Sequence, residues 1–245
     1  MIIFAVVKFE LTWGIESLYA RFRAQKSVTT DSRNCPPGSI FFALRGATFD
    51  GNRFAAKALE AGCSCAVVDD PAVAVDDRYV LVDDTLLALQ ALARRHRREW
   101  GRTVVGITGT NGKTTTKELT AACLSRRFKV LATEGNLNNA IGVPLTLLRL
   151  DDTHEIAVVE MGASHPGDIA ELVAIAEPDY ALITNVGKAH LQGFGSFEGV
   201  VGTKCELYDF VKAHGGKIFL HHEDYDRATY DTEPVDNGYC YIHSL

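Results

Sequence analysis

The chain contains, at residues 104–115, the stretch Val104-Val105-Gly106-Ile107-Thr108-Gly109-Thr110-Asn111-Gly112-Lys113-Thr114-Thr115. Its first part is apolar and β-branched, as in a buried strand, and a helical pattern follows the loop. A glycine-rich loop between a strand and a helix is the setting of a P-loop, where backbone N–H groups and the helix N-terminus bind phosphate. Ile107 stands where the usual motif has its first glycine. The alternative is a structural turn that contains Gly-Lys-Thr, and the strand–loop–helix setting favours nucleotide binding over it.

Short β-branched runs alternate with helical patterns on both sides of this stretch. The predicted strands are residues 41–44, 65–68, 79–82, 104–108, 130–132, 156–160, 181–184 and 218–220. The predicted helices are residues 53–61, 84–100 and 114–125, a helix opened by Pro166, and residues 197–212. This alternation favours an α/β fold, with a small N-terminal α/β domain over residues 1–100 and a mainly parallel, doubly wound sheet over residues 101–245. We expect the functional groups at the carboxyl ends of the strands.

The composition excludes several classes of protein. The chain has 245 residues, and 25 Lys+Arg against 31 Asp+Glu give a formal net charge of −6 at pH 7. A protein that coats nucleic acid normally carries the opposite sign. The apolar run at residues 2–7 is too short to span a bilayer, which needs about 20 residues. Six cysteines without metal-binding spacing indicate reduced side chains, so we expect a cytoplasmic protein.

One basic run, Arg94-Arg95-His96-Arg97-Arg98, ends the predicted helix 84–100. It is either a patch that binds phosphate or nucleic acid, or a solvated face whose cations favour the helix C-terminus. The net negative charge of the chain favours the solvated face.

Polar residues near the predicted strand ends are candidates for chemistry. Lys113 can reach the β- and γ-phosphates of a nucleotide, and the Thr114 hydroxyl can bind Mg²⁺. Glu160 ends the strand 156–160, so its carboxylate faces the same sheet edge as the P-loop and can bind Mg²⁺. The alternative is that Glu160 is an N-cap or a solvated carboxylate. His190 follows the strand 181–184, and there a ligand role and an ordinary polar role are equally supported. Lys204 lies within a helical pattern, and that pattern alone predicts a lysine on the surface.

Several motifs together resemble those of the Mur ligases, ATP-dependent enzymes that add amino acids to the peptidoglycan precursor. In the second half of the chain they are Gly109–Thr115, Glu160–His165, Asn185–His190 and Thr203–Tyr208. In the first half, Asp31–Arg33, Phe41–Gly46 and Asp50–Phe54 resemble the family's uridine-binding domain. The run Gly135–Thr146 is similar to that of the members that add D-alanyl-D-alanine, whereas members that add a diamino acid typically have a threonine pair at the positions of Asn138 and Asn139. The resemblance covers about residues 15–220.

The resemblance implies an amide-bond ligase that joins D-alanyl-D-alanine to UDP-N-acetylmuramoyl-tripeptide, in which ATP phosphorylates a carboxylate and an amine attacks the acyl phosphate. It implies catalytic roles for Lys113, His190 and Lys204. The ATP-binding residues it implies are Gly109, Thr110, Asn111, Gly112, Lys113, Thr114 and Thr115. Two Mg²⁺ ions are implied at Thr114, Glu160, His190 and Lys204, with Lys204 converted by CO₂ to a carbamate. The implied substrate-binding residues are Ser32, Arg33, Arg45, Gly46, Asn138 and Asn139.

Members of this family are nearly twice as long as the chain and carry a third, C-terminal domain that closes over ATP. Residues 221–245 match the family poorly. The resemblance therefore leads us to expect a truncated, monomeric ligase with an incomplete central domain, poorly active alone. Two alternatives remain open: the relative that adds a diamino acid, and a remnant that binds nucleotide and UDP-sugar without catalysis.

Overall fold

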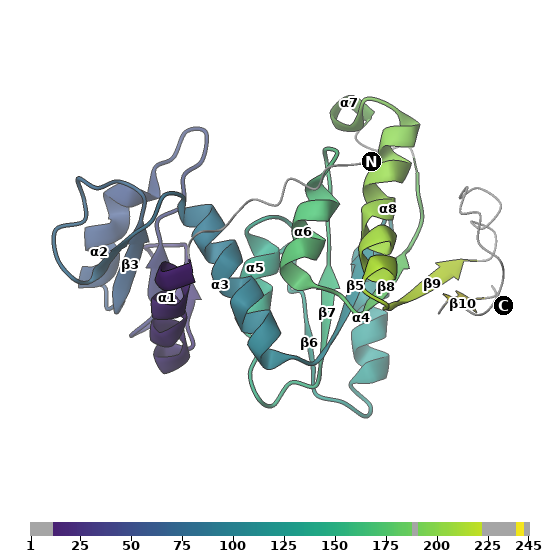
Figure 1. The fold of residues 1–245 in the computed structure, drawn as a ribbon, viewed down its shortest axis with the longest axis horizontal. Coiled ribbons are helices and arrows are strands. Elements are labelled where there is room, and N and C mark those ends of the chain that lie inside the picture. Colours follow the sequence, from purple (N-terminus) through teal and green to yellow (C-terminus); the bar gives the residue numbers. More distant parts are fainter. Residues whose placement is uncertain (1–11, 188–190, 222–238, 243–245) are drawn as a thin grey trace. The chain divides into compact units, whose positions relative to one another are not determined.

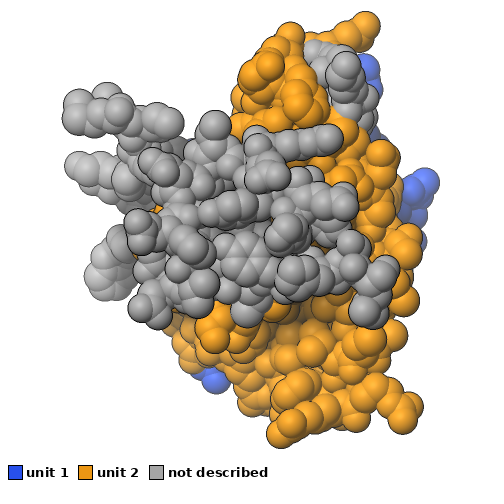
Figure 2. Space-filling view, turned by 90° about the vertical axis from the view of Figure 1, so that its right-hand side faces the viewer, with its two compact units in different colours: residues 1–92 blue, residues 93–245 orange. Residues whose placement is uncertain are grey.

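The computed structural model of the protein describes residues 12–187, 191–221 and 239–242. The chain forms two compact units, Met1–Leu92 and Ala93–Leu245, which are coloured separately in Figure 2. The boundary between them lies inside a helix, whereas the sequence suggested a boundary near Gly101. In the described part of the chain, no helix is both long and apolar enough to cross a membrane.

The first unit is built on a four-stranded sheet with the order β1-β2-β3-β4, and every pair of neighbouring strands is parallel. Its elements in chain order are α1 (Thr12–Gln25), β1 (Val28–Thr29), β2 (Ile40–Phe42), the 3₁₀ helix η1 (Gly51–Phe54), α2 (Ala55–Glu60), β3 (Cys65–Val68), β4 (Tyr79–Leu81) and α3 (Thr85–Trp100). The sequence did not predict α1, although Leu18, Tyr19 and Phe22 form a buried stripe at helical spacing. Asp84 caps α3 as expected, because its Oδ1 accepts the Leu87 N–H at 2.8 Å.

The second unit contains a six-stranded sheet with the order β10-β9-β8-β5-β7-β6, again with parallel neighbours only (Figure 1). Its elements in chain order are β5 (Thr103–Thr108), α4 (Lys113–Leu124), β6 (Val130–Ala132), α5 (Gly142–Leu147), β7 (Ile156–Glu160), α6 (Asp168–Ala176), β8 (Tyr180–Ile183), α7 (Leu191–Phe194), α8 (Phe197–Ala213), β9 (Lys217–His221) and β10 (Tyr239–Ile242). All eight predicted strands are present. Helix α6 begins at Asp168 rather than at Pro166, because Gly167 has a left-handed conformation with φ of 88°.

The connections that leave the neighbouring strands β5 and β8 run toward opposite sides of this sheet. The chain first passes through α4 to the outer strand β6, returns to β7, and then crosses through α6 to β8 on the other side of β5. Right-handed crossovers in the two directions place α4 on one face of the sheet and α6 and α8 on the other, as Figure 1 shows. The sheet is therefore doubly wound, as predicted, and the switch point at the carboxyl end of β5 is where such folds bind ligands.

The basic run at the end of α3 binds the C-terminal end of α6. The Arg94 and Arg98 Nε atoms each donate to Glu177 Oε1 at 2.9 Å. Arg97 is buried and donates to the carbonyl oxygens of Ala176 and Glu177, each at 2.9 Å. The carbonyl groups at a helix C-terminus lack partners within the helix, which makes them acceptors for a guanidinium group. The prediction of a solvated face is therefore wrong for Arg97, and Arg94 and Arg98 are ion-paired.

The interaction of Glu177 with this run predicts a pH-dependent contribution to stability. Burial raises the pKa of Glu177, but hydrogen bonds from Arg98 and Arg94 outweigh it, so the pKa is lowered overall. We expect Glu177→Gln to lower the free energy of unfolding by about 1 kcal/mol at pH 7. That difference corresponds to about 2–4 °C in Tm for a chain of this size. Because the folded-state pKa is depressed, the difference is fully present above the ordinary carboxyl pKa and is lost as the pH falls from that value through the lowered folded-state pKa.

Thermal unfolding of both proteins between pH 7 and pH 3 measures this effect. Asp152→Asn, which neutralises an exposed carboxylate on a loop of the same unit, is the control. Equal Tm values for wild type and Glu177→Gln at pH 7 would contradict the assignment.

Candidate functional site

The predicted P-loop connects β5 to α4 at the switch point of the second sheet. Gly109 and Gly112 have φ values of 147° and 76°, which side chains disfavour. A Cβ at Gly109 would collide with the Thr184 hydroxyl, so a glycine is required where these two loops approach each other. Ile107, which replaces the first glycine of the usual motif, is a buried residue of β5 and takes no part in the loop.

Only part of this loop has N–H groups free for phosphate. The Thr110 N–H donates to the Asn185 carbonyl oxygen, and the Asn111 N–H donates to Asn185 Oδ1, both at 3.0 Å. The first turn of α4, by contrast, leaves the N–H groups of Lys113, Thr114 and Thr115 without partners inside the helix. The Thr114 and Thr115 side chains are exposed. The first turn of α4 is therefore the part of the P-loop that can receive an anion.

Two lysine side chains lie close enough for their charges to interact. Lys113 Nζ donates to the carbonyl oxygens of Gly109 and Thr110 at 2.9 and 3.0 Å, so the Lys113 side chain is hydrogen-bonded to the P-loop itself. Lys204 on α8 is only 3% exposed, and its Nζ lies 6.0 Å from the centre of the Phe194 ring. Burial, and secondly the charge of Lys113, lower the pKa of Lys204 to about 8. Lys204 is thus not the surface lysine that its helical pattern suggests.

Glu160 ends β7 at the same edge, with 1% of its surface exposed. Its Oε1 accepts a hydrogen bond from Asn138 Nδ2 at 2.8 Å, whereas its Oε2 is buried without a hydrogen-bond partner among the described residues. The Glu160 N–H donates to Thr133 Oγ1 at 3.0 Å, which fixes the end of the strand. A buried carboxylate oxygen without a partner is costly unless a cation or donor binds it.

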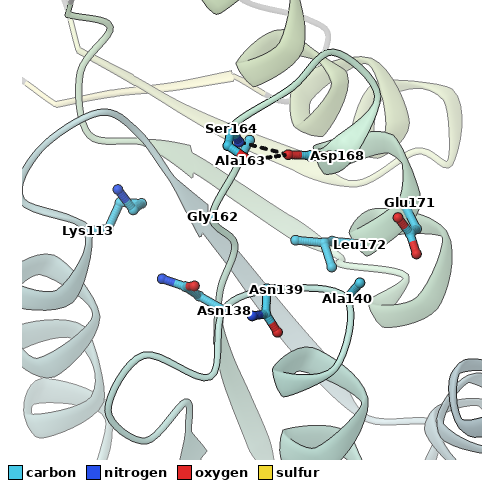
Figure 3. Close-up of a pocket in the computed structure, with 10 residues that line it drawn as sticks. All are labelled: Lys113, Asn138, Asn139, Ala140, Gly162, Ala163, Ser164, Asp168, Glu171 and Leu172. Carbon is cyan, nitrogen blue, oxygen red and sulfur yellow. Dashed lines mark hydrogen bonds between the residues drawn. The ribbon is translucent and has the colours of Figure 1, made fainter. Parts of the chain in front are cut away.

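A cavity of about 450 Å³ adjoins these groups (Figure 3). Lys113, Asn138 and Asn139 line one part of it, and Asp168 and Glu171 of α6 line another. Asn139 also stabilises the turn that precedes α5, because its Oδ1 accepts the N–H groups of Ile141 and Gly142 at 3.1 and 2.9 Å. The structure thus brings the predicted residues Lys113, Asn138 and Asn139 to one cavity. His190 lies outside the described residues.

These residues fit a bound Mg²⁺ ion. Mg²⁺ prefers oxygen ligands and is commonly held by one or two carboxylates together with substrate phosphates. Glu160 supplies a buried oxygen that has no hydrogen-bond partner in the described part of the chain, and Thr114 supplies a hydroxyl on the first turn of α4. No group of three or more His, Cys, Asp or Glu residues with metal-binding geometry occurs in the described ranges. The remaining ligands of such an ion would therefore come from elsewhere, such as nucleotide phosphates.

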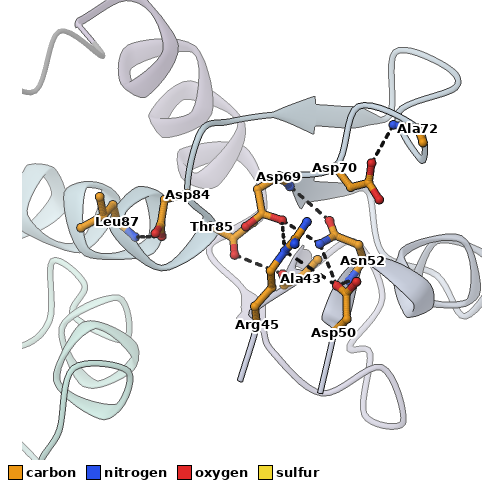
Figure 4. A network of polar contacts seen from close by, with 10 residues as sticks. All are labelled: Ala43, Arg45, Asp50, Asn52, Asp69, Asp70, Ala72, Asp84, Thr85 and Leu87. Carbon is orange, nitrogen blue, oxygen red and sulfur yellow. Dashed lines mark hydrogen bonds and ion pairs between the residues drawn. The ribbon is translucent and has the colours of Figure 1, made fainter. Parts of the chain in front are cut away.

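The first unit has a polar cluster of its own at the carboxyl ends of β2 and β3 (Figure 4). Arg45 Nε donates to Asp69 Oδ1 at 2.7 Å, and Asn52 Nδ2 donates to the same oxygen at 2.7 Å. Asn52, only 2% exposed, accepts the Asp69 N–H in return at 3.1 Å. Half of the Arg45 side chain is exposed, and within the described residues its terminal nitrogens form no hydrogen bond. They are therefore available to an external anion.

The other two predicted residues with polar side chains in this unit follow β1. Arg33 donates to Asp31 through Nε at 2.9 Å and through a terminal nitrogen at 2.8 Å. This side-chain hydrogen bonding lowers the pKa of Asp31 to about 2. Ser32 lies in the same turn, and Gly46 closes the turn after Arg45 by donating to the Phe49 carbonyl oxygen at 2.8 Å. Because β1, β2 and β3 are neighbours in a parallel sheet, all four predicted residues lie at one edge.

Sequence reasoning missed several residues that hold the predicted ones in place. Asp69 and Asn52 orient Arg45, and Asp69 could have been noticed because it directly follows a strand. Lys117 is completely buried, and its Nζ donates to the Thr133 carbonyl oxygen at 2.6 Å. Lys117 could have been found from the sequence, because it lies four residues after Lys113 and therefore on the same face of α4. Lys117 thereby ties the helix that follows the P-loop to the segment that leads to Asn138.

Comparisons with known proteins agree with this geometry. The family model described as "Mur ligase middle domain" matches residues 107–238, and that described as "Mur ligase family, catalytic domain" matches residues 25–97. The first match extends beyond residue 220, where the motif resemblance ends. The UDP-N-acetylmuramoyl-tripeptide–D-alanyl-D-alanine ligase of Bacillus subtilis strain 168 is 42% identical over 213 residues, which are 86% of this chain and 47% of that protein. The enzyme of the same name from Escherichia coli K12 is 44% identical over 189 residues, 77% of this chain and 42% of that protein.

Solved structures of relatives have the same fold. A crystal structure of MurF from Acinetobacter baumannii matches with a TM-score of 0.77 and 36% identity, over 89% of this chain and 48% of that one. MurF ligase from Thermotoga maritima in complex with ADP matches with a TM-score of 0.79 and 35% identity, over 89% of this chain and 50% of that one. The chain spans about half the length of the curated relatives it matches. Because the middle-domain model alone covers more than half of its residues, the chain belongs to the Mur ligase family.

Proposed function

We propose that this chain supplies the nucleotide-binding and precursor-binding parts of an ATP-dependent ligase that joins D-alanyl-D-alanine to UDP-N-acetylmuramoyl-tripeptide. The observation that carries the proposal is the meeting of the P-loop and Glu160 at one sheet edge, where one Glu160 oxygen has no hydrogen-bond partner among the described residues and where the charge of Lys113 acts on the buried Lys204. The names of the curated relatives support this choice of substrates, and the ADP complex of the Thermotoga maritima relative supports the nucleotide.

The proposed reaction has two steps. A substrate carboxylate attacks the γ-phosphorus of ATP and releases ADP, which gives an acyl phosphate. The amine of D-alanyl-D-alanine then attacks the acyl carbon, loses a proton and displaces phosphate. Lys113 turns from the loop carbonyls toward the phosphates and stabilises their charge. Asn138 and Asn139, which line the cavity beside Lys113, bind the substrate peptide and orient its carboxylate.

We also propose that Glu160 and Thr114 hold Mg²⁺, together with His190 and Lys204, in two sites. When bound, Mg²⁺ neutralises phosphate charge. Lys204 would bind Mg²⁺ as a carbamate. The carbamate forms when the neutral amine of Lys204 attacks CO₂ and releases a proton. The low exposure of Lys204 and the repulsion from Lys113 favour the neutral amine that this reaction needs. The product is an anionic oxygen ligand in place of a cation.

Calorimetry with ADP tests the nucleotide site. We expect Lys113→Ala to weaken ADP binding about 10- to 100-fold, because charged hydrogen bonds contribute about 1.5–3 kcal/mol each. We expect Glu160→Gln to remove the part of the ADP affinity that depends on Mg²⁺ and to leave metal-free binding unchanged. Glu155→Gln, which changes the residue immediately before the start of the same strand, is the control. Unchanged ADP affinity in Lys113→Ala would reject the P-loop assignment.

The carbamate predicts a pH-dependent signal in ¹³C NMR with ¹³C-labelled bicarbonate. Because the pKa of Lys204 is lowered to about 8, the neutral amine and hence carbamylation increase as the pH rises through that value. Lys113→Ala removes the repulsive charge, so we expect the midpoint to move to higher pH. Lys204→Arg should abolish the signal, and Lys212→Arg on the exposed side of the same helix should keep it. A signal that persists in Lys204→Arg would contradict the assignment.

Binding of UDP tests the role of the first unit. We propose that Ser32, Arg33, Arg45 and Gly46 line the site of the uridine diphosphate group. We expect Arg45→Ala to weaken UDP binding about tenfold or more, since guanidinium–phosphate hydrogen bonds are charge-assisted. Binding of uridine, which lacks phosphate, should change little. Arg78→Ala removes an exposed arginine that is also paired with an aspartate but precedes β4, at the opposite edge of the sheet, and it should bind UDP normally. Equal UDP affinity in wild type and Arg45→Ala would place the diphosphate elsewhere.

A further inference from the structure

The loop that follows β8 is bonded to the P-loop, and the side chain of Asn185 forms two of these hydrogen bonds. Its Oδ1 accepts the Asn111 N–H and its Nδ2 donates to the Asn111 carbonyl oxygen, both at 3.0 Å. Its own carbonyl oxygen accepts the Thr110 N–H at 3.0 Å. The carboxamide of Asn185 therefore pairs with both main-chain groups of Asn111, as a neighbouring strand would.

Neighbouring residues extend this pairing. The Thr184 N–H donates to the Thr108 carbonyl oxygen at 2.9 Å, and the Thr184 hydroxyl donates to the Asn111 carbonyl oxygen at 2.7 Å. The Gly187 N–H donates to Thr110 Oγ1 at 2.9 Å. We call Thr184, Asn185 and Gly187 the clasp. The clasp continues the β5–β8 ladder past the ends of both strands and into the phosphate-binding loop.

Only a carboxamide can form the central interaction of the clasp. Asparagine presents one donor and one acceptor side by side, which matches the N–H and C=O of a single residue. An aspartate of the same shape keeps the acceptor but places a negative charge against the Asn111 carbonyl oxygen. Asn111 is exposed and Asn185 is half-buried. Hydrogen bonds in such a place contribute little to the stability of the fold, so their consequence is the conformation of the loop.

The clasp matters most when nucleotide binds. In the structure, Lys113 Nζ also restrains the loop by donating to the carbonyl oxygens of Gly109 and Thr110. A lysine that turns to bind phosphate gives up these two bonds. The clasp makes no use of Lys113, so it still holds Thr110 and Asn111 in place. A loop that is already ordered loses less conformational entropy on binding, which increases affinity.

We propose that Asn185 is a positioning residue of the nucleotide site, which keeps the P-loop preformed through its carboxamide. The inference rests on the proposed nucleotide binding. In this proposal Asn185 does not contact the nucleotide. The residues of the loop fall into two groups according to what their N–H groups bind. Thr110 and Asn111 have their N–H groups held by Asn185, and Lys113, Thr114 and Thr115 present theirs to phosphate.

Calorimetry of the full chain with ADP and Mg²⁺ tests the proposal. We expect Asn185→Asp and Asn185→Ala each to weaken ADP binding about tenfold or more, because the loop must be ordered on binding. The Tm should fall by no more than about 2–4 °C, because the bonds are near the surface and contribute about 1 kcal/mol. Asn34→Asp, which makes the same atomic change on an exposed loop of the first unit, should bind ADP as wild type does.

Amide hydrogen exchange provides a second measurement that does not depend on ADP. In Asn185→Ala we expect the Asn111 N–H to exchange about tenfold faster or more, with the core strands unchanged, because a hydrogen-bonded amide exchanges only when it opens. ADP affinity within twofold of wild type in both variants would overturn the inference, even if exchange increases. Unchanged exchange of Asn111 would overturn it as well. A wild-type chain that does not bind ADP would instead reject the proposed nucleotide site, so the two failures are distinguishable.

Discussion

The pairing of β5 with both β7 and β8 is the constraint on which the candidate site depends. Ile107 pairs with Glu160 on one side and with Leu182 on the other, in parallel register. Because the three strands run in the same direction and end at nearly the same level, the segments that follow them begin at one edge. The strand register alone therefore brings together the P-loop, the Glu160 carboxylate and the loop that contains Asn185, and no ligand is needed to do so. A shift of one residue in either ladder would turn the side chains to the other face of the sheet.

The second unit keeps charged groups buried that lack full compensation. Among the described residues, Glu160 has one carboxylate oxygen without a hydrogen-bond partner, and the one charge that acts on Lys204 is that of Lys113 rather than a carboxylate. Burial of charge is costly, so a site of this kind stores a free-energy deficit that a ligand of suitable charge can reduce. The phosphates of a nucleotide have the charge that complements Lys113, and a divalent cation has the charge that complements Glu160 and the proposed carbamate of Lys204. The local arrangement thus favours such a ligand in spite of the overall net charge of −6.

The first unit treats its charges differently. Arg45 is held by Asp69 and Arg33 by Asp31, so each guanidinium group has a carboxylate partner before any ligand arrives. The Arg33–Asp31 pair is exposed and contributes little to stability, and in the Arg45–Asp69 pair the arginine is half exposed. Their effect is to limit the rotamers of long side chains, which lowers the entropy that an anion must remove on binding. In the first unit the charged side chains are thus already oriented by their partners, whereas in the second unit buried charges lack full compensation.

The sequence by itself determined the alternation of strands and helices, the P-loop and the placement of Glu160 at a strand end. Those features depend on local periodicity and on the fixed direction of a strand, which neighbouring residues encode. The tertiary structure alone decided which side chains became partners. Glu177 lies 79 residues from Arg98, and Asn185 lies 74 residues from Asn111. No local pattern specifies such pairs, so the basic run of α3 was misinterpreted and the clasp on the P-loop was not foreseen. The burial of Lys204 was also decided by the tertiary structure, because only the packing of α8 on the sheet removes that lysine from water.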